Sequence, residues 1–175
     1  MDDTYIDSVL SGNIEAFSYF IKKYKNMAYS ISLSIVKDEQ YAEEVTQDAF
    51  MKAFNGLKSF NRTAQFRSWF YRIVVNESFL RLRSLKKRKT FVYIEEQSDA
   101  ILEEQFEEIS KDHTDKIHKV LSLLDPKESL ALELFYLQEL SINDVTIITG
   151  WTTANTKVIL HRARKSVRQI WKTSL

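Results

Sequence analysis

The chain has 175 residues, enough for one mid-sized domain or two small ones, and its 44% hydrophobic content excludes disorder throughout. It has a formal net charge of +1 and no cysteine, which excludes disulfides and thiolate metal sites and fits a reducing compartment. Its 3 glycines and 1 proline favour helices over a β-structure with many turns. The first ten residues lack the apolar run of a signal peptide, and no segment approaches the roughly 20 apolar residues of a membrane span. We therefore expect a soluble, cytoplasmic protein.

Charge is strongly sorted along the chain. Residues 81–89 carry six basic side chains and no acidic one, and residues 95–112 carry eight acidic side chains and one basic one. Residues 153–172 carry six basic side chains and no acidic one. A solvated surface explains any single run of this kind. The basic, acidic, basic order favours two parts that face polyanions, joined by an acidic connector.

The first half of the chain reads as a series of helices. Apolar residues recur at helical spacing over 4–36, with a break at Gly12 and Asn13, and again over about 39–58. Residues 59–65 are polar and predict a loop. A further helix is expected from 66 to the mid-80s.

This last helix has apolar residues on two sides. A helical wheel assigns one set to the core, namely Phe66, Trp69, Phe70, Ile73 and Leu80. Tyr71, Val75 and Phe79 lie on the far side, flanked by Arg67 and Arg72. Rings beside guanidinium groups can form a platform on which unpaired bases stack. The alternative is that a neighbouring helix covers them; the basic run that follows favours the platform.

The second half begins with the acidic segment. Helical pattern resumes near 114–124, and Asp125 followed by Pro126 marks the start of a helix that runs to about Leu137. Ser141 can cap a helix over 142–149, and residues 149–151 form a turn. Thr152 can cap a helix over 153–171. A short helix, a turn that contains glycine and a longer helix form a helix-turn-helix pattern.

The longer helix of this pattern carries apolar and basic residues on separate sides. Its inward stripe is Thr156, Leu160, Ala163, Val167 and Ile170. Another side carries cations that suit the phosphates beside a major groove, and short polar residues at its start could reach base edges. An ordinary helical hairpin with a solvated basic side is the alternative. The predicted fold is therefore all-α, with helical domains at 1–90 and 114–175 and an acidic linker at 91–113.

Four notable blocks of sequence lie along the expected helices, at 42–54, 66–83, 124–141 and 160–165. Together these blocks resemble the extracytoplasmic-function (ECF) group of bacterial RNA polymerase sigma factors. AEEVTQDAFMKAF (42–54) resembles the helix that binds core polymerase, and FRSWFYRIVVNESFLRLR (66–83) resembles the promoter-melting helix. LDPKESLALELFYLQELS (124–141) and LHRARK (160–165) resemble the second domain. All four occur in the order and spacing of the family.

The resemblance implies a role for each matching position. The residues expected to bind the β′ clamp of core polymerase are Glu44, Gln47, Asp48, Phe50 and Phe54. The residues expected to capture and hold the melted −10 strand are Asn61, Arg62, Thr63, Gln65, Arg67, Trp69, Tyr71, Arg72 and Asn76. The residues expected at the −35 duplex are Thr152, Thr153, Asn155, Lys157, His161, Arg162, Arg164 and Lys165.

The resemblance also implies partners and shows departures. It implies contact with core polymerase through the β′ clamp and the β flap, promoter DNA, and an anti-sigma factor, with no membrane contact of the chain's own. ANTKVI (154–159) stands where the family has Gly-Thr-Val-Lys-Ser-Arg, so an expected phosphate or base contact is missing at Ile159. Thr146 and Thr156 replace apolar residues, and their hydroxyls need partners such as helix carbonyls.

Three other classes of function are the alternatives. An enzyme is disfavoured because His113 and His118 are five residues apart, unlike metal ligands on one helix face, and no Gly-rich phosphate loop or nucleophile elbow occurs. No cofactor, metal or catalytic residue is expected. A stand-alone helix-turn-helix regulator would account for 114–172 but not for 42–83. A pure interaction scaffold would lack the steep salt dependence of phosphate contacts.

Overall fold

The computed structural model describes residues 1–95 and 120–173, with side chains over 1–88 and 120–172, and every regular element in these ranges is helical. The all-α prediction is confirmed. Most of the acidic linker at 91–113, the start of the helix expected near 114–124, His113 and His118 lie outside the described residues. The elements of the first half are α1 (Asp2–Leu10), the 3₁₀ turn η1 (Ile14–Phe17), α2 (Ser18–Val36), α3 (Glu39–Gly56), the 3₁₀ turn η2 (Leu57–Ser59) and α4 (Phe66–Glu95).

The elements of the second half are α6 (Pro126–Leu132), the π-helical turn η3 (Glu133–Leu137), α7 (Ile142–Thr149) and α8 (Thr153–Thr173). The predicted start signals are confirmed. The Asp125 carboxylate accepts the amide of Lys127 at 2.9 Å, and Ser141 forms a reciprocal capping box with Asp144. Gly150 adopts a left-handed φ of 74°, which ends α7 and turns the chain into α8.

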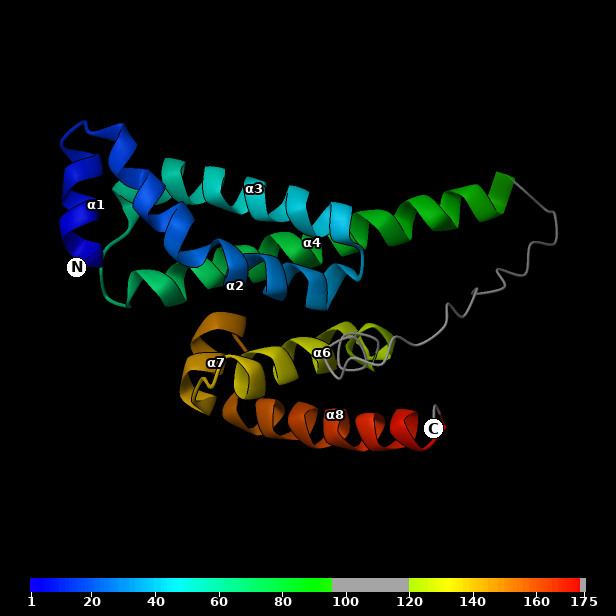
Figure 1. The fold of residues 1–175 in the computed structure, drawn as a ribbon. Coiled ribbons are helices and arrows are strands. Elements are labelled where there is room, and N and C mark those ends of the chain that lie inside the picture. Colours follow the sequence, from blue (N-terminus) through cyan, green and yellow to red (C-terminus); the bar gives the residue numbers. More distant parts are fainter. Residues whose placement is uncertain (96–119, 174–175) are drawn as a thin grey trace, which may run out of the picture.

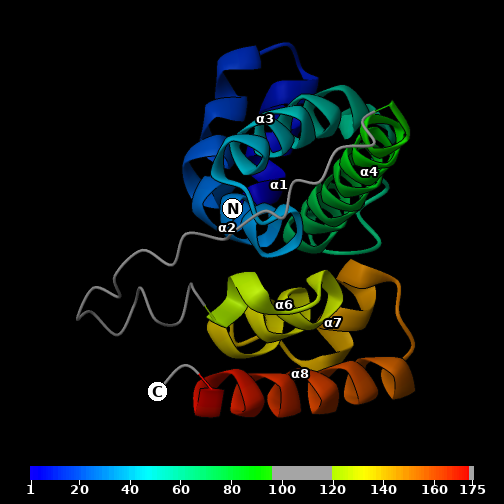
Figure 2. The same cartoon turned by 90° about the vertical axis from the view of Figure 1, so that its right-hand side faces the viewer.

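The helices form three layers (Figures 1 and 2). The first contains α1 to α4, the second contains α6 and α7, and α8 forms the third. Helix α6 packs against α2, and α7 packs against α4. The middle layer therefore separates α8 from the first four helices.

One hydrophobic core extends from the first half into the second. Phe20, Ile31 and Phe70 belong to the same buried cluster as Val145 and Ile148. Each of these five side chains is at most 1% exposed. The domain boundaries stay a prediction, but in this structure the two halves pack together and share apolar contacts.

A smaller core joins α6 to α8. The apolar stripe predicted for α8 faces inward, and its Leu160 and Ala163 pack with Leu132 and Ala131. Thr156 is fully buried, and its hydroxyl donates to the carbonyl of Thr152 at 3.0 Å. The expected carbonyl partner is thus confirmed.

Candidate nucleic-acid interface

The loop between α3 and α4 presents polar side chains on a tight turn. The Asn61 Oδ1 accepts the amide of Thr63 at 3.2 Å and its hydroxyl at 2.8 Å. Arg62 has a left-handed φ of 59°, and its guanidinium pairs with the Asp7 carboxylate of α1. Asn61, Arg62, Thr63 and Gln65 are all exposed, so the loop residues proposed for the −10 strand share one accessible surface.

The start of α4 continues this surface. Arg72 and Asn76 are exposed. Trp69 is half-buried, with its ring 4.8 Å from that of Phe60 and its edge 3.5 Å from where a Cβ at Gly56 would lie. Trp69 is therefore fixed by packing on one side and keeps only part of its surface for a ligand.

Tyr71 does not belong to the exposed surface. Its side chain is 2% exposed and meets the Tyr24 ring edge-on, with the ring centroids 5.9 Å apart. Burial raises its pKa. Val75 is also 2% exposed, and Phe79 packs against the same cluster. The expectation that Tyr71 faces DNA is wrong in this arrangement, because α7 packs on α4 and the shared core covers that side.

The wheel assignment of α4 is otherwise mostly confirmed. Phe66 and Phe70 are buried, and Trp69 and Ile73 pack against the core. Leu80 is 54% exposed, so its assignment to the core is wrong.

An open cleft lies between the loop, α2 and the second half of the chain. Its lining includes Lys23, Gln65, Arg67, Tyr71 and Gln138. Within the described part of the chain, the Nε of Arg67 is one of two buried side-chain polar atoms without a hydrogen-bond partner. The Nε of Arg67 is thus one spare donor in the wall of this cleft, where Lys23 is already paired with Asp2 at 2.6 Å.

An acidic residue that the sequence reasoning missed fastens α1 beside this cleft. The Asp2 carboxylate accepts hydrogen bonds from Tyr24 at 2.5 Å, Lys23 at 2.6 Å and Tyr19 at 2.9 Å. Burial alone would raise the pKa of Asp2, but the three donors outweigh it and lower the pKa, while burial and the bond to Asp2 raise the pKa of Tyr24 to about 12. The feature of the sequence that could have indicated this role of Asp2 is the acidic first turn of α1.

The outer surface of α3 carries the residues expected to bind polymerase, with one exception. Gln47 and Asp48 are exposed. Glu44 is partly exposed and pairs with Arg81 at 2.6 Å, and Phe54 is also partly exposed. Phe50 is 7% exposed and its ring lies 4.5 Å from that of Phe70, so the prediction that Phe50 forms a contact surface is wrong.

The position of Phe50 follows from helix geometry, because it shares the inward stripe of α3 with Ala49 and Ala53. Met51, which the sequence reasoning did not single out as a binding residue, is 62% exposed between Asp48 and Asn55. An exposed methionine adapts its shape readily and suits a protein contact.

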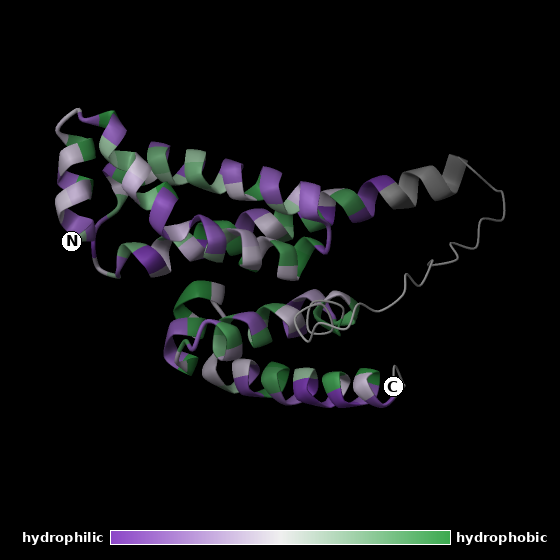
Figure 3. Cartoon of the chain, viewed as in Figure 1, coloured by the Kyte–Doolittle hydropathy of each residue, from purple (hydrophilic) through white to green (hydrophobic). Residues whose placement is uncertain are grey.

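Helix α8 and its cap present the cationic surface that the sequence predicts. All eight residues proposed for the −35 duplex are exposed, namely Thr152, Thr153, Asn155, Lys157, His161, Arg162, Arg164 and Lys165. In Figure 3 the hydrophilic residues of α8 lie along its outer edge and the hydrophobic ones toward α6 and α7. The Thr152 hydroxyl accepts the amide of Asn155 at 3.2 Å, which confirms it as the cap.

Ile159 is 7% exposed and packs with Leu124 and Leu132. Its side chain lies in the core between α6 and α8, which agrees with the expected absence of a DNA contact at this position. The isoleucine adds apolar contact in this core. The lost contact itself stays a prediction.

Comparison with known proteins decides the family. Residues 20–88 match the sigma-70 region 2 family. The chain is 30% identical over 133 residues to the RNA polymerase sigma factor YlaC of Bacillus subtilis, covering 73% of this chain and 76% of that one. It is 25% identical over 178 residues to the ECF RNA polymerase sigma factor SigW of the same organism, covering 94% and 93%. The chain belongs to the ECF group of RNA polymerase sigma factors.

A solved structure has the same fold. The sigma factor RpoE of Bartonella quintana, determined in complex with the anti-sigma factor NepR, superposes with a TM-score of 0.70 at 22% identity. The match covers 89% of this chain and 96% of that one. No helix in the described ranges is long and apolar enough to cross a membrane, and no group of three or more histidine or acidic side chains there could hold a metal ion.

The second half of this sigma factor also carries an apolar groove. Its floor includes Leu132, Leu137, Val167 and Trp171, and Arg164 lies at its edge. The Arg164 guanidinium donates to the Tyr136 hydroxyl at 3.1 Å. Arg164 therefore belongs to both the cationic surface of α8 and the edge of the groove.

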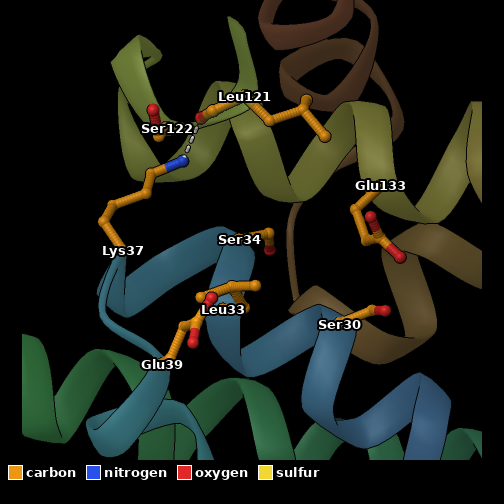
Figure 4. A pocket seen from close by; sticks show the side chains of 8 residues that line it. All are labelled: Ser30, Leu33, Ser34, Lys37, Glu39, Leu121, Ser122 and Glu133. Carbon is orange, nitrogen blue, oxygen red and sulfur yellow. Dashed lines mark hydrogen bonds between the residues drawn. The ribbon is translucent and has the colours of Figure 1, made fainter. Parts of the chain in front are cut away.

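A pocket of about 210 Å³ lies where the two halves meet (Figure 4). Lys37 follows α2 with a left-handed φ of 61°, and its Nζ donates to the carbonyl of Leu121 at 2.5 Å. Glu39 and Glu133 also line this pocket. Burial lowers the pKa of Lys37 to about 8, although the Asp125 carboxylate acts in the opposite direction. A lysine thus joins the first layer to the beginning of the second.

Proposed function

We propose that this sigma factor binds core RNA polymerase and directs it to promoters by reading the −35 element as duplex and the −10 element as melted strand. The observation that carries the proposal is the exposed surface of α8 and its cap, which presents eight polar or cationic residues and no acid. A helix of this kind fits a major groove, where cations neutralise phosphates and short polar side chains reach base edges.

For the −10 strand we propose the exposed loop and the edge of α4 beside it. The residues are Asn61, Arg62, Thr63, Gln65, Arg67, Trp69, Arg72 and Asn76. Melted bases are read in pockets and on aromatic surfaces, because their edges are unreachable inside the stack. The partly exposed Trp69, and the position of the partly exposed Arg67 in the wall of the open cleft, support this assignment.

For core polymerase we propose two contacts. Gln47, Asp48 and Met51 on the outer surface of α3 would meet the β′ clamp, with Glu44 and Phe54 at its edge. The apolar groove beside α8 would take the β flap. Its apolar floor and the arginine at its edge suit a partner helix with an apolar stripe and flanking carboxylates.

We also propose an anti-sigma factor as a partner and the cytoplasm as the place of action, with no catalysis by the chain itself. RpoE of Bartonella quintana is held by the anti-sigma factor NepR and shares this fold. An anti-sigma factor would act by covering the surfaces that meet polymerase or DNA.

The test is transcription by core polymerase on fragmented DNA from the source organism, with and without the full chain. We expect discrete new start sites that appear only with the chain. A variant with Lys157, Arg162 and Lys165 changed to alanine should lose most of these starts, because each residue faces outward from α8. The matched control changes Lys22 and Lys25, exposed lysines of α2, to alanine.

The outcomes separate the candidate functions. New starts that depend on the α8 cations support a sigma factor. Binding of duplex promoter DNA by the chain alone, without new starts, would instead indicate a stand-alone helix-turn-helix regulator. If the chain shows neither new start sites nor binding to duplex promoter DNA, both proposals are contradicted.

A further inference from the structure

Arg62, in the loop proposed for the −10 strand, is paired with a carboxylate of α1. Its guanidinium contacts Asp7 of α1, 55 residues earlier in the chain. Asp7 raises the pKa of Arg62, and the charge of Asp3 adds to the effect. The first helix therefore provides negative charge at the place where a DNA phosphate would be needed.

The loop holds Arg62 in a defined direction. Asn61 closes the turn through its two hydrogen bonds to Thr63. Arg62 itself adopts a left-handed backbone conformation, which is uncommon for a residue with a Cβ and costs energy unless its surroundings support it. The conformation of the turn thus directs the Arg62 side chain toward α1.

Helix α1 holds the carboxylate equally firmly. Ile6, next to Asp7, is 1% exposed in the core. Asp2 is fixed by its three donors, and the Tyr5 ring stacks on that of Tyr19 with the centroids 3.8 Å apart. Asp7 is therefore presented from a rigid support.

The pair can still exchange partners. The Arg62 side chain is 40% exposed and that of Asp7 is 64% exposed. A surface ion pair of this kind is weak, and a phosphate oxygen makes the same charge-assisted contact with a guanidinium. An incoming nucleic-acid strand can replace the carboxylate without unfolding either element.

We propose that Asp7 is an internal phosphate mimic that occupies Arg62 until a single strand displaces it, and so sets the affinity of the loop for melted DNA. The proposal rests on the proposed function of the loop. Binding then exchanges one anionic partner of Arg62 for another. In a chain without the Asp7 charge, Arg62 meets the strand without first giving up a carboxylate, so the loop neutralises one more phosphate charge on balance.

The test uses the full chain and fluorescently labelled dT20, a strand that probes backbone contacts independently of promoter sequence. Anisotropy titrations from low to moderate salt give Kd for the wild type and for Asp7→Asn. We expect Asp7→Asn to bind about two- to fivefold more tightly. We also expect its plot of log Kd against log salt to be steeper by about 0.7, the value for one more unit of net positive charge set against a single strand.

Three further variants make the result specific. Glu15→Gln removes the same charge from an exposed site on η1, and we expect it to leave Kd close to the wild-type value. In an Arg62→Gln background, Asp7→Asn should have no effect on Kd. Asp7→Ser serves as a second neutral variant, and circular dichroism checks that each chain is folded.

Equal affinities of wild type and Asp7→Asn would overturn the proposal, as would an equal gain in Glu15→Gln or a gain that persists without Arg62. Absence of dT20 binding by both chains would overturn it as well. The transcription assay distinguishes these failures from failure of the proposed function. A protein that directs new starts, while its wild type and its Asp7→Asn variant bind dT20 equally, would still be a sigma factor without the phosphate mimic.

Discussion

Helices α4 and α8 each combine apolar residues with arginines, yet the structure uses them differently. In α8 the apolar residues form one stripe and the cations cover the remaining surface, so one side packs and the other stays open. In α4, apolar and aromatic residues occur on two sides, and both sides are buried, with Phe70 at 0% and Tyr71 at 2% exposure. A helix that is apolar on two sides is typical of an interior position.

The layers explain the difference. Helix α4 packs against α2 and α3 of its own layer and against α7 of the second layer, whereas α8 is the outer layer and meets α6 and α7 on one side only (Figure 2). An outer helix keeps a surface for a ligand, while an inner helix keeps only its edges and its ends. For this reason the surface that we propose for the −10 strand consists of the loop and the partly or fully exposed residues of α4 beside it.

The largest predicted effect comes from two adjacent residues of α4. Tyr71→Ala should lower the free energy of unfolding by about 3–5 kcal/mol, because it removes a buried ring from the core shared by both halves. Arg72→Ala should change it by less than about 0.5 kcal/mol, because that side chain is exposed. Urea unfolding followed by circular dichroism measures both. Similar small losses for the two variants would mean that the side of α4 with Tyr71 is open in solution.

A second pair of neighbours tests the covering layer from its own side. Ile148 is 1% exposed and belongs to the shared core, whereas Ile147 is 39% exposed. We expect Ile148→Ala to cost about 2–4 kcal/mol and Ile147→Ala less than about 1 kcal/mol. A Tyr71→Ala and Ile148→Ala double variant should show non-additive losses if both side chains support one packed unit. Strict additivity would contradict a shared core.

The sequence predicted α8 well because its apolar residues form a single stripe, so only one side of the helix can pack against the core. Basic residues without any acidic residue lie opposite a regular apolar stripe, which defines the exposed side of the helix. Local signals at Ser141, Gly150 and Thr152 define where the helices start and stop. These signals are local in the chain, and the structure confirms them.

The sequence did not predict which side of α4 is covered, because that depends on α7, about 70 residues later. Aromatic residues at Tyr71 and Phe79 suit either a base platform or a core, and only tertiary packing decides. The pair of Asp7 with Arg62 and the bond from Lys37 to Leu121 were missed for the same reason: each joins residues far apart in sequence. Phe50 was misassigned by family analogy, although its own helical stripe indicates burial.

The third prediction tests the open side of α8. Lys157→Ala should weaken promoter duplex binding by the polymerase complex about five- to tenfold, and should reduce the slope of log Kd against log salt by about 1, the expected loss for one phosphate contact. Its unfolding free energy should stay near that of the wild type, because Lys157 is exposed. Val158→Ala is the matched control, since Val158 is the next residue and carries no charge. An unchanged salt slope for Lys157→Ala would mean that this residue does not meet a phosphate.

The smallest predicted effect concerns the lysine that anchors the covering layer. The pKa of Lys37 is lowered from 10.5 to about 8 in the folded chain, so between these values the folded chain binds fewer protons than the unfolded chain. The cost of burying the charged amine is fully present below pH 8 and is relieved as the pH rises toward 10.5. Relative to Lys37→Met, the wild type should therefore gain stability over this window, on the order of 1 kcal/mol once partial exposure is allowed for.

Urea unfolding of both chains at several pH values from about 7 to 10.5 measures this difference, and subtraction removes the titration of all other groups. The Asp125 carboxylate acts on Lys37, and Glu39 and Glu133 line the same pocket; all three acidic residues are present in both chains. Lys22→Met, at an exposed site on α2, should track the wild type. A constant difference between wild type and Lys37→Met would show that the amine stays hydrated, and hence that the second layer is not closed over α2 at that point. The same layer covers Tyr71. If the stability difference between wild type and Lys37→Met does not change with pH, and Tyr71→Ala also has a small effect, the side of α4 with Tyr71 would again be a candidate surface for DNA.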